Sequence, residues 1–173
     1  MSEDMTHREW GPERSRLLTW RDPLPTAARI SDMSGAEFVQ ALLDGTFPEP
    51  PFAALVGARL VSAGDGEAVL RCVPDESFYS PIGMVHGGLL CTLLDTVAGL
   101  AVHSLLPART GYSTIEIKVN FLRPLRGGGG ELEARGRVVK LGRSVAFAEC
   151  EARAEDGELV GAASTSLLIA RVS

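Results

Sequence analysis

The sequence predicts an α+β fold in which a curved antiparallel sheet of six strands wraps around one long apolar helix. Residues 82–106 carry a single formal charge, Asp95, so a helix there is hydrophobic nearly all round and must be enclosed by the rest of its chain. Residues 112–122 alternate apolar and polar side chains, which is the period of a half-buried strand. Further strand-like segments lie on both sides of the helix, and only a curved sheet built from them can bury it.

The N-terminal region is predicted to be an irregular arm followed by one short helix. Residues 1–31 mix proline, arginine and acidic side chains without a period, which favours an arm. Residues 31–44 place apolar side chains at helical spacing and stop before Gly45, a helix-ending residue. The chain is therefore divided into residues 1–45, the arm and short helix, and residues 46–173, the main domain.

The strands of the main domain are separated by recognisable turns. Residues 59–73 predict a hairpin around Gly64-Asp65-Gly66, whose glycines permit positive φ. After the helix come the strand segments 112–122, 131–140, 143–154 and 158–170. We expect them to form an antiparallel meander. Period and length do not fix the order of strands, so other α+β arrangements stay open.

The composition excludes several classes of protein. A chain of 173 residues with 45% hydrophobic and 23% charged side chains is neither disordered nor a coiled coil. The net charge is −5 and there is no Lys/Arg-rich run, which argues against nucleic acid as a partner. The three cysteines, Cys72, Cys91 and Cys150, are widely spaced and predict neither a disulfide framework nor a zinc site.

The same features predict a cytoplasmic protein that does not enter a membrane. Residues 1–16 carry charges of both signs and lack the apolar core of a secretory signal. Three inert thiols fit a reducing compartment. Residues 82–106 are long enough to span a bilayer, but Asp95 near their middle would cost about 2.5 to 3.5 kcal/mol there. We therefore expect no membrane partner.

Asp95 is the most unusual residue of the chain. A carboxylate among Leu93, Leu94 and Val97 is expensive to bury without a partner. An isolated acid in apolar surroundings is therefore a candidate for a functional group. The alternative is a structural acid, either satisfied by the hydroxyls of Thr92 or Thr96 or facing solvent at a gap in the sheet.

The start of the apolar helix is the second candidate. His86, Gly87 and Gly88 stand where the helix begins, and bare glycines let a ligand approach the backbone closely. The first N–H groups of a helix lack partners and lie at its positive end, so Gly87 and Gly88 are suited to hold a developing oxyanion. The alternatives are a tight loop into the helix or close packing against the sheet for the glycines, and a core or capping histidine for His86.

The spacing of these candidates predicts a dimer. Gly87 and Asp95 are eight residues apart, or about 12 Å along one helix. One helix does not easily bring both to the same carbonyl group. If two copies pack with their helices antiparallel, the Gly87 end of one faces Asp95 of the other, and the site lies on the dimer interface.

These residues also carry a family resemblance. The run from Ser80 to Asp95, Ser-Pro-Ile-Gly-Met-Val-His-Gly-Gly-Leu-Leu-Cys-Thr-Leu-Leu-Asp, resembles the His-Gly-Gly…Asp signature of hotdog-fold acyl-CoA thioesterases of the phenylacetate-degradation type. The segments 111–124 and 139–143 are similar to the same family, and the resemblance covers residues 46–170. It implies a hotdog fold and a homo-oligomer, either a dimer or a dimer of dimers.

The resemblance implies hydrolysis of an acyl-CoA thioester to a free acid and CoA. Asp95 is then the general base or nucleophile, Gly87 polarises the thioester carbonyl with Gly88 beside it, and His86 positions that carbonyl. Ser113, or its neighbour Thr114, falls where the family carries a hydroxyl near the catalytic water. Ser80 departs from the pattern, which has Asn or Gln six residues before the histidine.

The charge distribution fits a CoA ligand. Residues 109–143 hold eight basic and three acidic side chains, so this segment has a charge of 8 − 3 = +5 in a chain of net charge −5. Arg123, Lys140 and Arg143 stand at predicted strand ends or turns, where they can meet the nucleotide phosphates or be merely solvated. No P-loop or dinucleotide-binding motif is present, and we expect no cofactor and no metal.

Two other functions stay open. A non-catalytic acyl-CoA-binding hotdog module is favoured by Ser80, whereas the joint presence of Asp95, His86 and Gly87 argues for catalysis. A hotdog dehydratase or hydratase also binds acyl thioesters, but its expected His-led Gly/Pro-rich motif is not seen in the sequence.

Overall fold

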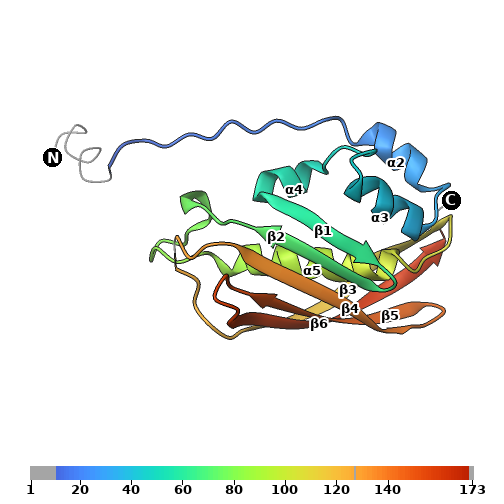
Figure 1. Ribbon diagram of the computed structural model, residues 1–173. Helices are drawn as coiled ribbons and strands as arrows, with labels where there is room; N and C mark the ends of the chain where they lie inside the picture. The colour runs from blue at the N-terminus through green and yellow to red at the C-terminus, as the bar shows by residue number, and fades with distance from the viewer. Residues whose placement is uncertain (1–10, 127, 172–173) are drawn as a thin grey trace.

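The computed structural model describes residues 11–126 and 128–171, so the first ten residues of the expected arm and Gly127 of the glycine run lie outside the described residues. The helices are α2 (Leu24–Ile30), α3 (Gly35–Leu43), α4 (Pro51–Val56), the short 3-10 helix η1 (Glu76–Phe78) and α5 (Gly87–His103). The strands are β1 (Ala58–Gly64), β2 (Glu67–Cys72), β3 (Thr110–Phe121), β4 (Leu132–Leu141), β5 (Val145–Arg153) and β6 (Leu159–Arg171). The predicted α+β class is confirmed (Figure 1).

The six strands form one antiparallel sheet in the order β1-β2-β4-β5-β6-β3. The expected four-strand meander is therefore wrong in one respect. Strands β4, β5 and β6 follow one another, but β3 pairs with β6 at the far edge and not with β4. The reason is that α5 carries the chain across the sheet between β2 and β3, which leaves the place beside β2 to β4.

Helix α5 lies across the inner face of the sheet and contacts all six strands (Figure 1). Small side chains on this face let it come close, because Ala134, Ala148 and Ala152 are all buried there. At Gly136 a Cβ atom would lie 2.7 Å from the carbonyl oxygen of Val97, so only glycine fits under the helix at that point. Leu93, Leu94 and Val97 are fully buried in the same layer. The sheet therefore wraps the apolar helix as the sequence predicts.

Both ends of α5 are fixed by side chains. At its start, Nδ1 of His86 accepts a hydrogen bond of 2.9 Å from the backbone N–H of Gly88, so the histidine is the N-cap. At its end, the hydroxyl of Ser104 donates to the carbonyl of Ala101 at 2.7 Å and accepts from the N–H of Gly66 at 3.0 Å. Gly66 belongs to the β1–β2 turn, where it and Asp65 both have positive φ. The hairpin and the helix are thereby locked together.

The N-terminal helices pack on one end of this core. Helix α3 begins at a capping box between Ser34 and Glu37, as expected for a helix in this region, and the N–H of Gly35 donates to the carbonyl of Leu106 at 2.8 Å. Two helices were not predicted, α2 and α4. Both carry proline in their first turn, where its missing N–H has no cost, so the prolines start these helices and do not only break the chain.

Strand β3 is an edge strand that exposes apolar side chains. Its expected alternation holds at Ile117 and Val119, which are partly buried, but Ile115 is 57% exposed and Phe121 is 58% exposed. The register shifts between Thr114 and Glu116, which moves Ile115 out of the regular pattern. Within the described residues, no helix is long and apolar enough to cross a membrane.

Candidate active site

Asp95 lies halfway along α5 and is partly exposed, with its carboxylate turned toward β3. The hydroxyl of Thr114 on β3 donates a hydrogen bond of 2.9 Å to Oδ1 of Asp95. Thr92 and Thr96 do not satisfy this carboxylate, because their hydroxyls donate to the helix carbonyls of Gly88 at 3.0 Å and of Thr92 at 2.7 Å. The structural alternative that rested on Thr92 or Thr96 is therefore wrong, and the partner of Asp95 comes from another element.

The structure brings Thr114, and not Ser113, to Asp95. Successive side chains of a strand point to opposite faces of the sheet. Thr114 faces α5, whereas Ser113 is exposed and pairs in register with Leu168. Of the two hydroxyls that the sequence offered at this position, only that of Thr114 contacts the carboxylate within one chain.

The charge of Asp95 contributes to the raised pKa values of two neighbouring groups, Tyr112 and Cys150. Burial, and to a smaller extent the negative charge of Asp95, raises the pKa of Tyr112 to about 12. Burial first, and then the negative charges of Asp95 and Glu149, raise the pKa of the Cys150 thiol to about 12. Both groups therefore keep their protons at neutral pH, and neither is a nucleophile.

The N-terminus of α5 borders a cavity of about 440 Å³. Ser80, His86, Gly87, Phe121 and Arg123 are among the residues that line it. A Cβ atom at Gly87 would lie 2.9 Å from Cε1 of Phe121, so a larger residue here would have to displace the phenylalanine ring at the cavity. As the first residue of the helix its N–H has no intrahelical acceptor, so a ligand oxygen in this cavity can take it.

His86 is held in one orientation by its own backbone and by the helix. The backbone N–H of His86 donates to the carbonyl of Phe78 at 2.8 Å, and Nδ1 of its ring accepts from the backbone N–H of Gly88. An imidazole that accepts at Nδ1 carries its proton at Nε2 when it is neutral, so the exposed edge of the ring is a hydrogen-bond donor. The backbone N–H of Gly88 is thus engaged by the N-cap histidine. The backbone N–H of Gly87 stays available to an oxyanion.

Ser80 belongs to the same cavity and lies in a hydrogen-bonded turn. Its N–H donates to the carbonyl of Met84 at 2.7 Å, and its carbonyl accepts from Gly83 at 2.9 Å. The position six residues before His86 is therefore close to the helix N-terminus, as the motif requires.

One chain does not unite the two halves of the candidate site. Gly87 and Asp95 lie on the same continuous helix, about 12 Å apart along its axis. The basic candidates are divided in the same way. Arg123 lines the cavity at the Gly87 end and forms an ion pair of 2.9 Å with Asp156. Lys140 and Arg143 are exposed at the β4–β5 turn, which lies at the other end of the sheet.

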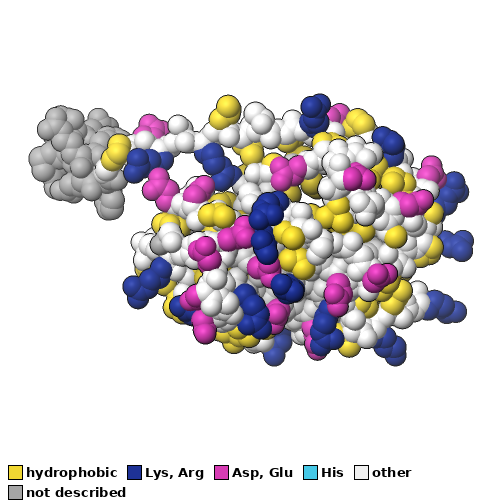
Figure 2. Space-filling view, viewed as in Figure 1, with side chains coloured by type: hydrophobic (Ala, Val, Ile, Leu, Met, Phe, Trp, Pro, Cys, Tyr) yellow, Lys and Arg dark blue, Asp and Glu magenta, His cyan; other side chains and the backbone are white. Residues whose placement is uncertain are grey.

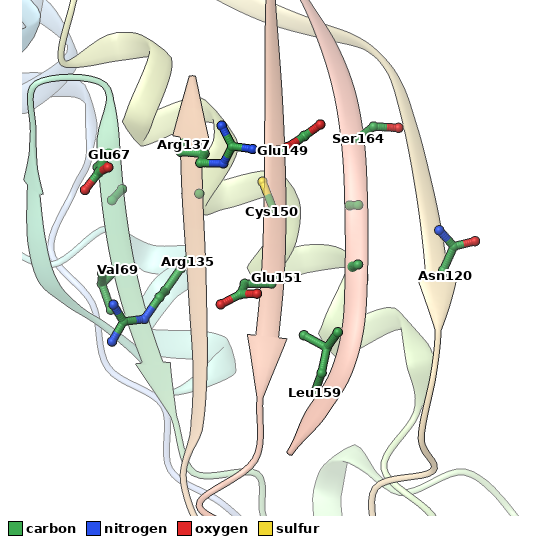
Figure 3. Close-up of a pocket in the computed structure, with 14 residues that line it drawn as sticks. Glu67, Val69, Asn120, Arg135, Arg137, Glu149, Cys150, Glu151, Leu159 and Ser164 are labelled. Atoms are coloured by element: carbon green, nitrogen blue, oxygen red, sulfur yellow. Dashed lines mark hydrogen bonds and ion pairs between the residues drawn. The ribbon is translucent and has the colours of Figure 1, made fainter. Parts of the chain in front are cut away.

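Another hollow lies away from both halves of the candidate site. It has a volume of about 600 Å³ and lies on the outer face of the sheet, lined by Arg135, Arg137, Glu149 and Glu151 among others. Figure 3 shows these side chains in front of the strands, with α5 behind the sheet. Arg137 is paired with Glu149, and Figure 2 shows both signs of charge intermixed on this face. Arg135 and Glu151 are paired as well, with Glu133 and Arg153, and neither Asp95 nor Gly87 lines this hollow.

The comparison with known families agrees with the geometry of α5 and its sheet. Residues 82–161 match the model of the thioesterase superfamily. A protein from Halobacterium salinarum described as a candidate esterase is 37% identical over 119 residues, which are 66% of this chain and 77% of that protein. The chain belongs to the thioesterase superfamily. Its fold is accordingly the hotdog fold that the motifs imply, with α5 as the enclosed helix.

Two further relatives extend the comparison. Human acyl-coenzyme A thioesterase 13 is 28% identical over 88 residues, covering 51% of this chain and 61% of that protein. A phenylacetic acid degradation-related protein from Ralstonia eutropha is 29% identical, with a TM-score of 0.69 over 76% of this chain and 98% of that structure. The segment 82–161 that matches the family model contains α5 and the strands β3, β4 and β5. Membership of the family supports thioester hydrolysis in general.

Proposed function

We propose that this thioesterase-superfamily protein hydrolyses acyl-CoA thioesters to a free acid and CoA. The observation that carries the proposal is the carboxylate of Asp95, held at 2.9 Å by Thr114 on an otherwise apolar helix that begins with a glycine amide at a cavity. The human relative named an acyl-coenzyme A thioesterase supports CoA as the thiol.

The active unit that we propose is a homodimer. With two helices antiparallel, Asp95 of one protomer faces the Gly87 cavity of its partner, and two equivalent sites form around the two-fold axis. The exposed surface supports this arrangement. β3 is an edge strand of 12 residues, and apolar side chains are exposed along it at Ile115 and Phe121 and just after it at Leu122. Such an apolar edge is a ready template for pairing with a second copy.

Hydrolysis in such a site adds the elements of water across the C–S bond. With Asp95 as general base, its carboxylate takes a proton from water while the water oxygen attacks the thioester carbon. The carbonyl oxygen becomes an oxyanion that the Gly87 N–H stabilises, and we expect Nε2–H of His86 to donate to it as well, since Nδ1 of that ring already accepts from Gly88. Collapse of the adduct expels CoA as a thiolate, which takes up the proton. With Asp95 as nucleophile, a mixed anhydride forms first and water then cleaves it.

The dimer also gathers the basic side chains. Arg123 stands at the Gly87 end of one protomer, and Lys140 and Arg143 stand at the opposite end of the sheet, which is the Asp95 side. An antiparallel pair of helices places these two ends together. We propose that these side chains bind the phosphates of CoA, where a guanidinium suits the planar recognition of phosphate oxygens.

Ser80 favours a second candidate function. The serine is shorter than the Asn or Gln of the motif and lacks its amide, so the cavity at Gly87 can bind a thioester without orienting water well. On this view the protein is an acyl-CoA-binding module that does not turn over its ligand.

Release of free thiol from a panel of acyl-CoA thioesters, read with a thiol reagent, decides between the two functions. Hydrolysis of at least one member, above a matched sample without protein, supports the thioesterase. Saturable binding of the same acyl-CoA without thiol release supports the binding module. Neither binding nor release would overturn both.

A further inference from the structure

A second cavity lies between α5 and the N-terminal helices. It has a volume of about 510 Å³, within the range of small-molecule sites. Its walls are mainly apolar and include Phe38 of α3, Ala53 and Val56 of α4, and Leu100 of α5. Two charged residues, Glu49 and Arg59, also line it, and both are exposed. The cavity thus has an apolar interior with charge confined to its rim.

One end of this cavity is next to Asp95. Thr92 and Thr96, three residues before and one residue after Asp95 on α5, both line it. Tyr112 lines it too, and the charge of Asp95 contributes to the raised pKa of this tyrosine. The cavity therefore begins where the proposed base stands.

The other end is lined by aromatic rings. His103 lines the cavity and stacks on Phe38, with ring centroids 4.8 Å apart and planes inclined by 28°. From Thr92 to His103 the helix rises by eleven residues, about 16 Å. Burial lowers the pKa of His103, so the ring is neutral at neutral pH and adds no charge to this end. An elongated space with apolar inner walls, and with Glu49 and Arg59 only at its rim, suits a hydrocarbon group better than a nucleotide.

We infer that this cavity binds the acyl group of the thioester, so that α3 and α4 determine which acyl groups the protein accepts. The inference rests on the proposed function. With the thioester carbon at Asp95, the acyl group extends along α5 toward His103 while CoA stays outside. The walls from α3 and α4 come from residues 38–56, which precede the segment 82–161 matched by the family. Acyl preference is thus set by a part of the chain separate from the catalytic motif.

Neighbouring alanines of α4 provide a matched test. Ala53 lines the cavity, whereas Ala54, one residue further on the same short helix and also partly buried, does not. Ala53→Phe and Ala54→Phe add the same bulk to the same helix. We would measure kcat/KM of both variants and of the unchanged protein on straight-chain saturated acyl-CoA thioesters of increasing length, after checking that their thermal unfolding midpoints agree.

The expected result is a change of selectivity in one variant only. In Ala53→Phe the ratio of kcat/KM for the longest good substrate to that for the shortest decreases by roughly 10-fold or more, because the ring occupies the space of several methylenes. In Ala54→Phe this ratio stays as in the unchanged protein. If Ala53→Phe does not fold, Leu42→Ala is the deciding variant. It enlarges the cavity from the α3 side, so we expect it to shift the preference to longer acyl chains.

The failures are distinguishable. If the unchanged protein hydrolyses some acyl-CoA but the selectivity of Ala53→Phe or Leu42→Ala matches it, the cavity does not hold the acyl group and the proposed function stands. If both phenylalanine variants shift alike, the effect is on α4 as a whole and the inference is overturned. If no acyl-CoA is hydrolysed, the proposed function and this inference both fail.

Discussion

Thr114 and Asp95 are joined across the gap between β3 and α5 by a hydrogen bond of 2.9 Å from the threonine hydroxyl to Oδ1 of the carboxylate. The bond uses one carboxylate oxygen and leaves Oδ2 for water or substrate. It also ties the proposed base to the edge strand, because Thr114 lies beside the register shift of β3. The position of the carboxylate therefore depends on the same strand that we propose to pair with a second protomer.

Asp95→Asn should keep the fold and lose most hydrolysis. The amide oxygen still accepts the hydrogen bond from Thr114, but the amide can neither take a proton from water nor attack the carbonyl. Loss of a general base lowers the rate by about 10² to 10⁴. Thiol release by the purified variant measures the effect, and its unfolding midpoint serves as the control. Turnover at the rate of the unchanged protein would make Asp95 a structural acid.

Thr114→Val and Ser113→Ala separate two neighbouring hydroxyls. The valine keeps the shape of threonine but removes the donor to Asp95, so kcat should decrease while KM changes less. The alanine replaces an exposed side chain that does not contact Asp95 within the chain, so both constants should stay near those of the unchanged protein. If Ser113→Ala lost activity instead, the serine would act in the partner's site and our assignment of Thr114 would be wrong.

The sheet and α5 were predictable because their patterns are long and their turns distinct. The hairpin at Asp65-Gly66 and the start of α5 at Gly87 lie where the sequence placed them. The place of β3 was not predictable, since its alternation is the same beside β4 or beside β6. Helices α2 and α4 were missed because we took their prolines as helix breakers. In both helices the proline lies in the first turn, where it is tolerated.

The candidate site was predictable only in its parts. Asp95 and Gly87 stand out by residue type, but the partner of Asp95 comes from a different element, and no spacing along the chain reveals which of two adjacent hydroxyls faces the helix. The cavity under α3 and α4 was not predictable either. It depends on two short helices and on the packing of Phe38 against His103.

Mixing two inactive variants should restore activity if the site lies between protomers. One chain carries Asp95→Asn, and the other carries Gly87→Val, whose side chain meets the ring of Phe121. Random exchange makes half of the dimers mixed, and each mixed dimer has one of its two sites intact, so about a quarter of the normal activity returns. Each variant alone, refolded in the same way, is the control. Activity in a sample that sediments purely as monomer would contradict the shared site.

The stability of the protein should decrease below pH 6.5 in a way that depends on His103. Burial alone lowers the pKa of His103 from its ordinary 6.5, so the unfolded chain takes up the proton before the folded chain does. The free energy of unfolding therefore decreases as the pH falls from 6.5 through the pKa of the folded state. Urea unfolding between pH 7 and about pH 5 measures this slope, above the range in which carboxylates with lowered pKa values titrate. His103→Gln should flatten it, and an equal slope in both proteins would show that other groups cause the loss.

Ser80→Asn should raise kcat with a smaller effect on KM, because it restores an amide at the position where the family motif has one. Ser80 lines the cavity with His86 and Gly87, and its backbone is hydrogen-bonded on both sides, so the change adds a longer side chain without moving the turn. If that side chain orients water or the thioester, misplacement by about 1 Å lowers the rate on the order of 10²-fold, and the asparagine removes this loss.

In the rival view Ser80 makes room for a bulkier acyl group, so asparagine clashes and KM rises with no gain in kcat. Kinetics on one short aliphatic and one aryl acyl-CoA separate these outcomes. No change in either constant on both substrates would place Ser80 outside the working site, and the alignment of this loop with the family motif would then be wrong.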